Sequence, residues 1–251
     1  IGDIVPGYKE SDGYELAGFV WFQGWNDMVD SGVYPDRGAD GGYDAYSEVL
    51  EHFIRDVRKD LSAPAMPFVI GVMGVGGPTS DYGPDRQRYV STHQNFRDAM
   101  AAPAMRDEFK GSVFAVLTEN YWDAELQGLV SRDERIKQAA KKIQKEDGLE
   151  SKAAQAVLET LRAEEFSDQE RELMAKGISN QAYHYLGSAK ILGQIGQAFA
   201  EALVGSDVSH SAEEKESRSA KEGGDDSVAR ERTWTQATTG KELRGTLISA
   251  E

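Results

Sequence analysis

The stretch Leu16–Asp27, "LAGFVWFQGWND", predicts the fold class of this chain. It begins as a continuous apolar run and stops abruptly at Gln23, where amide, glycine and acidic residues follow. A short run of this kind after a turn-like segment is typical of a strand buried on both faces of a parallel sheet. The polar residues that end the run would then lie at the carboxyl end of the strand, where α/β proteins bind their ligands.

Strand-like and helix-like segments alternate through the next hundred residues. Residues 46–61 carry apolar side chains at helical spacing, and residues 90–100 have a second helical pattern. Two strand-like runs, "MPFVIGVMGVGG" and "GSVFAVLTEN", flank that second helix. The alternation predicts an α/β fold with a doubly wound parallel sheet in three layers, as in flavodoxin-like proteins.

Residues 124–176 read as an inserted helical segment rich in charge. Ser167 and Glu170 have the spacing of a helix capping box. We interpret the segment as solvated helices packed on one side of the sheet, with a partner-binding surface as the alternative.

The final helix of the domain follows at about residues 189–203. Its predicted apolar face is accompanied by Gly193 and Gly196, which would allow a close approach to a neighbour. The residues of that face are Ile191, Leu192, Ile195, Phe199 and Leu203.

The composition restricts the classes of partner. Among 251 residues, 28 Lys and Arg stand against 43 Asp and Glu, and the net charge of −15 argues against nucleic acid and anionic membranes as partners. There is no cysteine and no apolar run long enough to span a bilayer. Residues 205–231 are charged and poor in large apolar side chains, which predicts a disordered linker. Residues 232–251 alternate around Thr239-Gly240 like the start of a truncated small β module.

The residues that end the first strand can form an oxyanion hole. The backbone N–H of Gly24 is unobstructed by a side chain, and Asn26 supplies an amide N–H nearby in the sequence. Two such donors converging on one point would stabilise a developing oxyanion. The alternative is that Asn26 and Asp27 merely cap the following loop.

Two blocks resemble the SGNH hydrolases, in particular the branch of sialate O-acetylesterases and acetylxylan esterases. "WFQGWND" resembles the family's third block, and "YHYLGSAKILGQIGQAFAEAL" resembles its last block, so the resemblance covers residues 1–204. It implies that Gly24 and Asn26 donate to the oxyanion, that Gln23 shapes the hole and that His184 is the general base. It also implies an acetylated carbohydrate as substrate, no cofactor or metal, and a secreted or periplasmic location.

Two departures from the family pattern set the limits of this hypothesis. The family's Gly-x-Ser block is absent, so we expect the chain to be N-terminally truncated, without its first strand, and inactive alone. The family acid would stand three residues before His184, where this chain has Gln181. A Ser-His dyad or an acid such as Asp27 would then be needed.

Two other readings of the sequence are available. A non-catalytic carbohydrate-binding or scaffold protein is the main rival to the esterase. A nucleotide-binding protein is disfavoured, because the glycines of "GVMGVGG" lack the dinucleotide spacing and no phosphate-binding lysine follows. The histidines outside the last block are expected to be structural or solvated: His52, His93 and His210.

Overall fold

The computed structural model describes residues 6–9, 11, 13–219, 231–235 and 242–246. The chain separates into two compact units. One comprises Ala17–Val208, and the other comprises Ile1–Leu16 together with Ser209–Glu251.

The regular elements agree closely with the alternation expected from the sequence. Before the C-terminal strands they are β1 (Phe19–Trp21), α1 (Trp25–Val29), α2 (Asp44–Asp60), β2 (Phe68–Val72), α3 (Val90–Ala101), β3 (Val113–Leu117), α4 (Ala124–Asp147), α5 (Ser151–Glu165), α6 (Asp168–Gly177) and α7 (Ala189–Ser219). Short 3₁₀ turns connect them: η2 (Thr79–Asp81), η3 (Gln87–Tyr89), η4 (Ala102–Met105), η5 (Asp107–Phe109), η6 (Thr118–Tyr121) and η7 (Ala182–Gly187).

The first three strands form a parallel sheet in the order β1-β2-β3. Phe19 pairs with Phe68, and Phe68 pairs with Val113. Every residue of the central strand β2 is buried. The prediction that the first strand is buried on both faces was wrong, because Val20 of β1 is 39% exposed. Among the described strands, β1 pairs with β2 alone.

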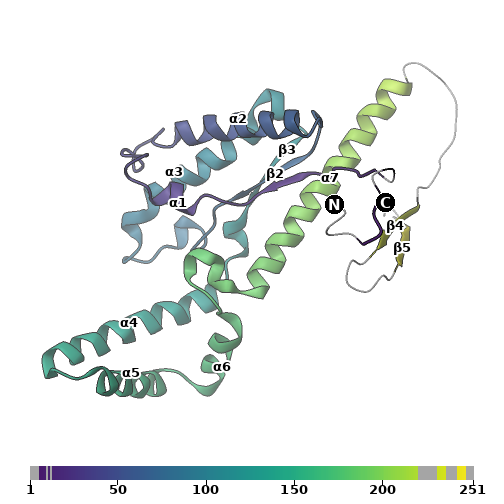
Figure 1. Cartoon of the computed structure of the whole chain (residues 1–251). Helices are drawn as coiled ribbons and strands as arrows, with labels where there is room; N and C mark the ends of the chain where they lie inside the picture. The colour runs from purple at the N-terminus through teal and green to yellow at the C-terminus, as the bar shows by residue number, and fades with distance from the viewer. Residues whose placement is uncertain (1–5, 10, 12, 220–230, 236–241, 247–251) are drawn as a thin grey trace. The chain divides into compact units, whose positions relative to one another are not determined.

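Helices cover both faces of this sheet. Phe53 of α2 packs on Phe19 and Phe68, with ring centroids 5.8 and 6.1 Å apart. Phe199 of α7 packs on Phe22 at 5.3 Å and lies beside Gly71. Because successive side chains of a strand point to opposite faces, α2 and α7 lie on opposite sides of the sheet. The arrangement is compatible with a three-layer α/β/α fold (Figure 1).

The order of the three described strands is that of one half of a doubly wound sheet. Both crossover helices, α2 and α3, pack against each other, and the order of the described strands follows the sequence without a reversal. Alternation of strands and helices predicts parallel pairing, but it does not determine strand order, which depends on the face that each helix covers.

Helix α7 meets the sheet differently from the prediction. Ile191, Ile195 and Phe199 are buried, but Leu192 is 42% exposed. A Cβ added at Gly193 or Gly196 would meet nothing within 4 Å, so these glycines are not needed for close approach. The close approach occurs in the sheet instead, where a Cβ on Gly71 would lie 2.5 Å from Phe22 and 2.6 Å from Phe199.

Helices α4, α5 and α6 pack mainly on one another rather than on one side of the sheet, and Figure 1 shows them extending away from it. Arg162 pairs with Asp133 at 2.7 Å, and Arg132 pairs with Glu165 at 3.0 Å. The capping box of Ser167 and Glu170 is confirmed. The expected packing on the sheet is not seen, because α5 buries no residue fully and these charged helices offer little apolar surface.

Beyond residue 204 the structure differs in part from the predicted linker. Helix α7 continues to Ser219, through good helix formers such as Ala and Glu, and residues 220–230 lie outside the described residues. β4 (Glu231–Thr235) and β5 (Glu242–Thr246) pair antiparallel, which confirms the hairpin, although its turn at Thr239-Gly240 is not among the described residues. No described helix has the length and hydropathy of a membrane span.

Candidate functional site

Gly24 makes the turn between β1 and α1. Its φ of 154° is unfavourable for other residues, and an added Cβ would lie 2.8 Å from the Phe96 ring. Glycine is therefore required here by both backbone conformation and packing. The Gly24 carbonyl accepts the first α1 hydrogen bond from Met28 at 2.9 Å, while its own N–H donates to no described residue.

Of the polar side chains around Gly24, Gln23 and Asn26 are exposed and Asp27 is half-buried. Gln23 Nε2 donates to Asp27 Oδ2 at 2.9 Å. Asn26 is exposed, and its side-chain amide makes no hydrogen bond with any described residue. The alternative that the side chains of Asn26 and Asp27 cap a loop finds no support. The Asp27 carboxylate accepts a hydrogen bond from the Gln23 side chain, and the Asn26 side chain bonds to no backbone group of the described residues. Two amide donors, from Gly24 and Asn26, are left available.

His184 lies in the turn η7, where Asn180 fixes its tautomer. His184 Nδ1 is 3.1 Å from Asn180 Oδ1, and the same oxygen accepts the Gln181 backbone N–H at 2.8 Å. An atom that accepts from a backbone N–H must be the amide oxygen, so Nδ1 of His184 is the donor to it. Nε2 of the neutral imidazole is left as an acceptor, which is the form that a general base requires.

Tyr185 anchors the residue next to His184 in the core. Its hydroxyl accepts from the Gly74 N–H at 2.9 Å and contacts Thr118 Oγ1 at 2.7 Å. Thr118 Oγ1 in turn donates to Val72 O at 2.6 Å, and burial raises the pKa of Tyr185. Gly74 follows β2 and Thr118 follows β3. The anchor therefore places His184 beside the carboxyl ends of two strands.

The turn after His184 has an unusual backbone. Tyr185, Leu186 and Gly187 all have left-handed φ values, of 53°, 59° and 58°. Two consecutive non-glycine residues in this region cost on the order of 1–3 kcal/mol each, and such strain is common at functional sites. The Leu186 carbonyl offsets part of it by accepting the N–H groups of Ser179 and Asn180 at 2.8 and 3.0 Å.

The sequence-predicted site residues come together in one pocket of about 650 Å³, here called the His184 pocket. The end of β1 and the start of α1 form one wall, and η7 forms the other. Trp25 and Tyr183 join the two walls as an aromatic pair in contact, with ring centroids 5.6 Å apart. The lining residues are Phe22, Gln23, Gly24, Trp25, Asn26, Met73, Tyr183, His184, Tyr185 and Leu192.

The residues considered as partners of His184 are placed elsewhere. No described contact joins the His184 ring to Gln181 or Asp27; the backbone carbonyl of Gln181 accepts the His184 N–H instead. Asn180 was missed by the sequence analysis, although an amide four residues before the histidine was a visible signal. No serine is among the residues that line the His184 pocket.

His52 and His93 contribute no group to this pocket. His52 is exposed on α2, and the side chain of His210 lies outside the description. His93 lines a different pocket, where burial and the charges of Arg97 and Arg86 lower its pKa to about 4. Within the described ranges, no group of three or more His, Asp or Glu side chains could hold a metal ion.

The arrangement combines two free amide donors with an imidazole that can accept a proton. Such donors stabilise the oxyanion formed when a hydroxyl attacks an ester carbonyl, and the imidazole activates that hydroxyl. The pocket lies at the carboxyl edge of the sheet, where parallel α/β proteins place their ligands.

Comparison with known proteins agrees with this chemistry. Residues 2–107 match the model of the family described as carbohydrate esterase, sialic acid-specific acetylesterase. The match includes Gln23, Gly24 and Asn26 and ends before His184. Searches of curated proteins and of solved structures found no match. Over residues 2–107, the chain is therefore similar to the sialic acid-specific acetylesterases among the carbohydrate esterases.

Proposed function

We propose that this chain carries the oxyanion hole and the general base of a serine-type carbohydrate O-acetylesterase with an SGNH hydrolase fold. The observation that carries the proposal is the shared pocket, in which Gly24 and Asn26 leave amide donors free beside the acceptor nitrogen of His184. The family match supports the carbohydrate ester as substrate. The acetyl carbonyl would lie between the two donors, with the sugar against Trp25 and Tyr183.

The reaction follows from these positions. His184 Nε2 accepts the proton of a serine hydroxyl as its oxygen attacks the acetyl carbon, and Gly24 and Asn26 donate to the resulting oxyanion. The imidazolium returns the proton to the sugar oxygen as the ester bond breaks. Water then hydrolyses the acetyl-serine by the same sequence of proton transfers. Because no serine lines the pocket, the serine must come from another segment, and we expect this chain alone to bind acetylated sugar without hydrolysing it.

The experiment uses a protein that contains this chain together with a segment carrying the serine block. Asn26→Ala should lower kcat on an acetylated sugar by about 10²–10³, with little change in KM, because the oxyanion forms only in the transition state. His184→Ala should cost at least as much, since serine is a weak nucleophile without a base. The exposed histidine of α2 provides the control, and His52→Ala should retain full activity. Hydrolysis at the unmutated rate by either pocket variant would refute the assignment.

A non-catalytic carbohydrate-binding function is the second candidate. The Trp25–Tyr183 pair, with rings inclined by 30°, offers aromatic faces for a sugar, and Asn180 gives His184 a neutral partner instead of an acid. The same variants separate the two functions. A binder should hold sugar with unchanged affinity in Asn26→Ala and should show no hydrolysis even with the serine segment present.

A further inference from the structure

Arg97 of α3 is buried, with only 3% of its side chain exposed. A buried charge is costly unless it is both paired and hydrogen-bonded. Nη1 of Arg97 pairs with Glu119 of η6, and Nε and Nη2 donate to three backbone carbonyls. Arg97 is not among the residues that line the His184 pocket, so the proposed reaction does not use it directly.

The three carbonyls belong to residues 73–77, which follow β2 and are here called the β2 loop. Arg97 Nε donates to the Met73 carbonyl at 2.8 Å. Its Nη2 donates to the carbonyls of Val75 at 3.3 Å and Gly77 at 3.0 Å. A guanidinium presents its donors in a rigid planar fork, so these contacts hold alternate peptide groups of the loop in one orientation.

The peptide group between Met73 and Gly74 connects Arg97 to the turn that carries His184. Its carbonyl accepts from Arg97, and its N–H donates to the Tyr185 hydroxyl at 2.9 Å. Because a trans peptide is planar, its C=O and N–H point in opposite directions, and fixing one fixes the other. A cationic donor on the carbonyl also polarises the peptide and makes its N–H a stronger donor.

A second route runs from Arg97 through η6. Glu119, the partner of Arg97, directly follows Thr118, whose Oγ1 is 2.7 Å from the Tyr185 hydroxyl. A Cβ on Gly74 would lie 2.0 Å from the Glu119 nitrogen, so the β2 loop packs directly against η6. Arg97 therefore contacts both segments that bind the Tyr185 hydroxyl.

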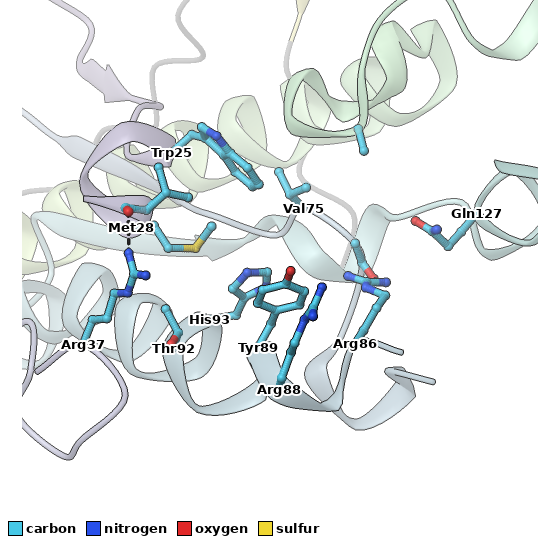
Figure 2. Close-up of a pocket in the computed structure, with 13 residues that line it drawn as sticks. Trp25, Met28, Arg37, Val75, Arg86, Arg88, Tyr89, Thr92, His93 and Gln127 are labelled. Carbon is cyan, nitrogen blue, oxygen red and sulfur yellow. Dashed lines mark hydrogen bonds between the residues drawn. The ribbon is translucent and has the colours of Figure 1, made fainter. Parts of the chain in front are cut away.

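The β2 loop also borders two pockets. Met73 lines the His184 pocket, and Val75 lines a second pocket of about 560 Å³. Figure 2 shows Val75 on one side of that second pocket and His93 of α3 on the facing side. Its lining also includes Arg37, Arg86 and Arg88. A shift of the loop would change the walls of both pockets.

We propose that Arg97 is a positioning residue for the candidate base His184. It fixes the peptide between Met73 and Gly74, this peptide holds Tyr185, and Tyr185 holds the left-handed turn that presents the imidazole. The inference rests on the proposed function, because it assigns a role in presenting the base. An arginine with a merely structural role would stabilise the sheet without affecting the imidazole.

Arg58 of α2 is a matched control at the opposite end of the sheet. It is 8% exposed and donates to the carbonyls of Met66 at 3.1 Å and Ser112 at 3.0 Å. These residues precede β2 and β3, whereas the contacts of Arg97 follow the same two strands. Arg58 and Arg97 therefore share their residue type, burial and kind of contact, but only Arg97 is connected to His184.

The test compares Arg97→Lys with Arg58→Lys by NMR of the isotope-labelled chain. Lysine keeps the charge, but its single nitrogen cannot replace the fork of donors. Arg97→Lys should make the Gly74 amide exchange about tenfold faster relative to the Ile70 amide of β2, which reports global unfolding. It should also convert the His184 ring from one tautomer, protonated on Nδ1, to a mixture of two. Arg58→Lys should lower stability toward urea comparably and leave both signals unchanged.

The possible outcomes are distinct. An unchanged His184 ring and unchanged relative exchange of Gly74 in Arg97→Lys would overturn the proposal, and so would equal changes in Arg58→Lys. If Arg97→Lys does not fold, Tyr185→Phe decides, because it removes the hydroxyl and leaves the arginine in place. It should produce the same mixture of His184 tautomers, and a single unchanged tautomer would refute the route through Tyr185.

Activity supplies a second readout in the protein that also contains the serine block. Arg97→Lys should lower kcat on an acetylated sugar by about 10–10², with little change in KM, because a misplaced base costs on this order. Arg58→Lys should retain kcat. Unchanged kcat in Arg97→Lys beside an inactive His184→Ala would refute the positioning role alone. An active His184→Ala would refute the proposed function, whatever the NMR signals show.

Discussion

At the residue scale, the contact between His184 and Asn180 fixes the tautomer and the orientation of the candidate base. Asn180→Asp places a carboxylate beside Nδ1, which stabilises the imidazolium that forms during proton transfer. We expect hydrolysis by the serine-containing protein to be kept or raised, and the acid limb of the kcat/KM profile to move to higher pH. Asn180→Ala should lower kcat about 10²-fold by releasing the ring from its productive orientation.

Gln181 provides the matched control for this residue. It occupies the position of the family acid in the sequence, but its side chain makes no described contact with the imidazole. Gln181→Asp should therefore leave the pH profile of kcat/KM nearly unchanged. A larger shift in Gln181→Asp than in Asn180→Asp would show that the histidine takes a different partner in the active protein.

At the scale of elements, the capping box at the start of α6 contributes to the stability of the helical extension, which consists of α4, α5 and α6. The pKa of Glu170 is lowered from 4.5 to about 2, mainly by the hydrogen bond from the backbone N–H of Ser167. The hydrogen bond from Arg132 is the second cause. Because this pKa is lowered in the folded state, the ionised Glu170 stabilises the fold fully above about pH 4.5. This stabilisation is lost as the pH falls toward 2. Glu170→Gln should remove that part of the acid dependence of stability.

The measurement is hydrogen exchange of the α6 amides between pH 5 and about pH 2, compared with global unfolding by urea. Glu172 is the control, because it lies on the same helix and pairs with Lys176 but takes no part in the cap. Glu172→Gln should keep the acid dependence of the unmutated chain. An unchanged dependence in Glu170→Gln would mean that the cap does not stabilise the extension.

At the scale of the whole molecule, packing between the sheet and α7 depends on Gly71. Gly71→Ala should lower the free energy of unfolding by about 1–3 kcal/mol, because the new methyl group would overlap the rings of Phe22 and Phe199. In Gly196→Ala of α7, the new methyl group would have no atom within 4 Å. This variant should raise the free energy of unfolding by about 0.5–1 kcal/mol, because alanine has the higher helix propensity. Urea denaturation would measure both, and a neutral Gly71→Ala would contradict this close packing of the layers.

The same packing explains how far the sequence alone could predict the structure. Apolar periodicity predicted β1, α2, β2, α3 and β3, because each of them buries a regular pattern of side chains. It missed the short helix α1, which has too few residues to show a period. It did not predict that one face of β1 is partly exposed at Val20, since that depends on which elements cover the strand. It also assigned the close approach to Gly193 and Gly196 instead of Gly71, because the partner of a glycine is not visible in its own segment.

In the candidate site too, residues in sequence blocks were predicted, and residues whose role depends on tertiary contacts were missed. Gln23, Gly24, Asn26 and His184 were identified from two sequence blocks, and the structure brings them to one pocket. Their chemical roles remain proposals. Asn180 was missed because its contact depends on the left-handed turn of residues 185–187, and such a backbone has no periodic signature. The pocket lined by Arg37, Arg86 and Arg88 was missed because its lining residues come from separate segments of the chain.

The helical extension leaves and rejoins the domain at nearly the same place. A Cβ on Gly177, at the end of α6, would lie 2.8 Å from Leu126 near the start of α4. Lys190 of α7 pairs with Asp123, just before α4, at 2.7 Å. Helices α4, α5 and α6 therefore form an insertion whose two ends lie close together. Homologous proteins are therefore free to lengthen, shorten or exchange it during evolution, while His184 keeps its distance from Gly24 and Asn26.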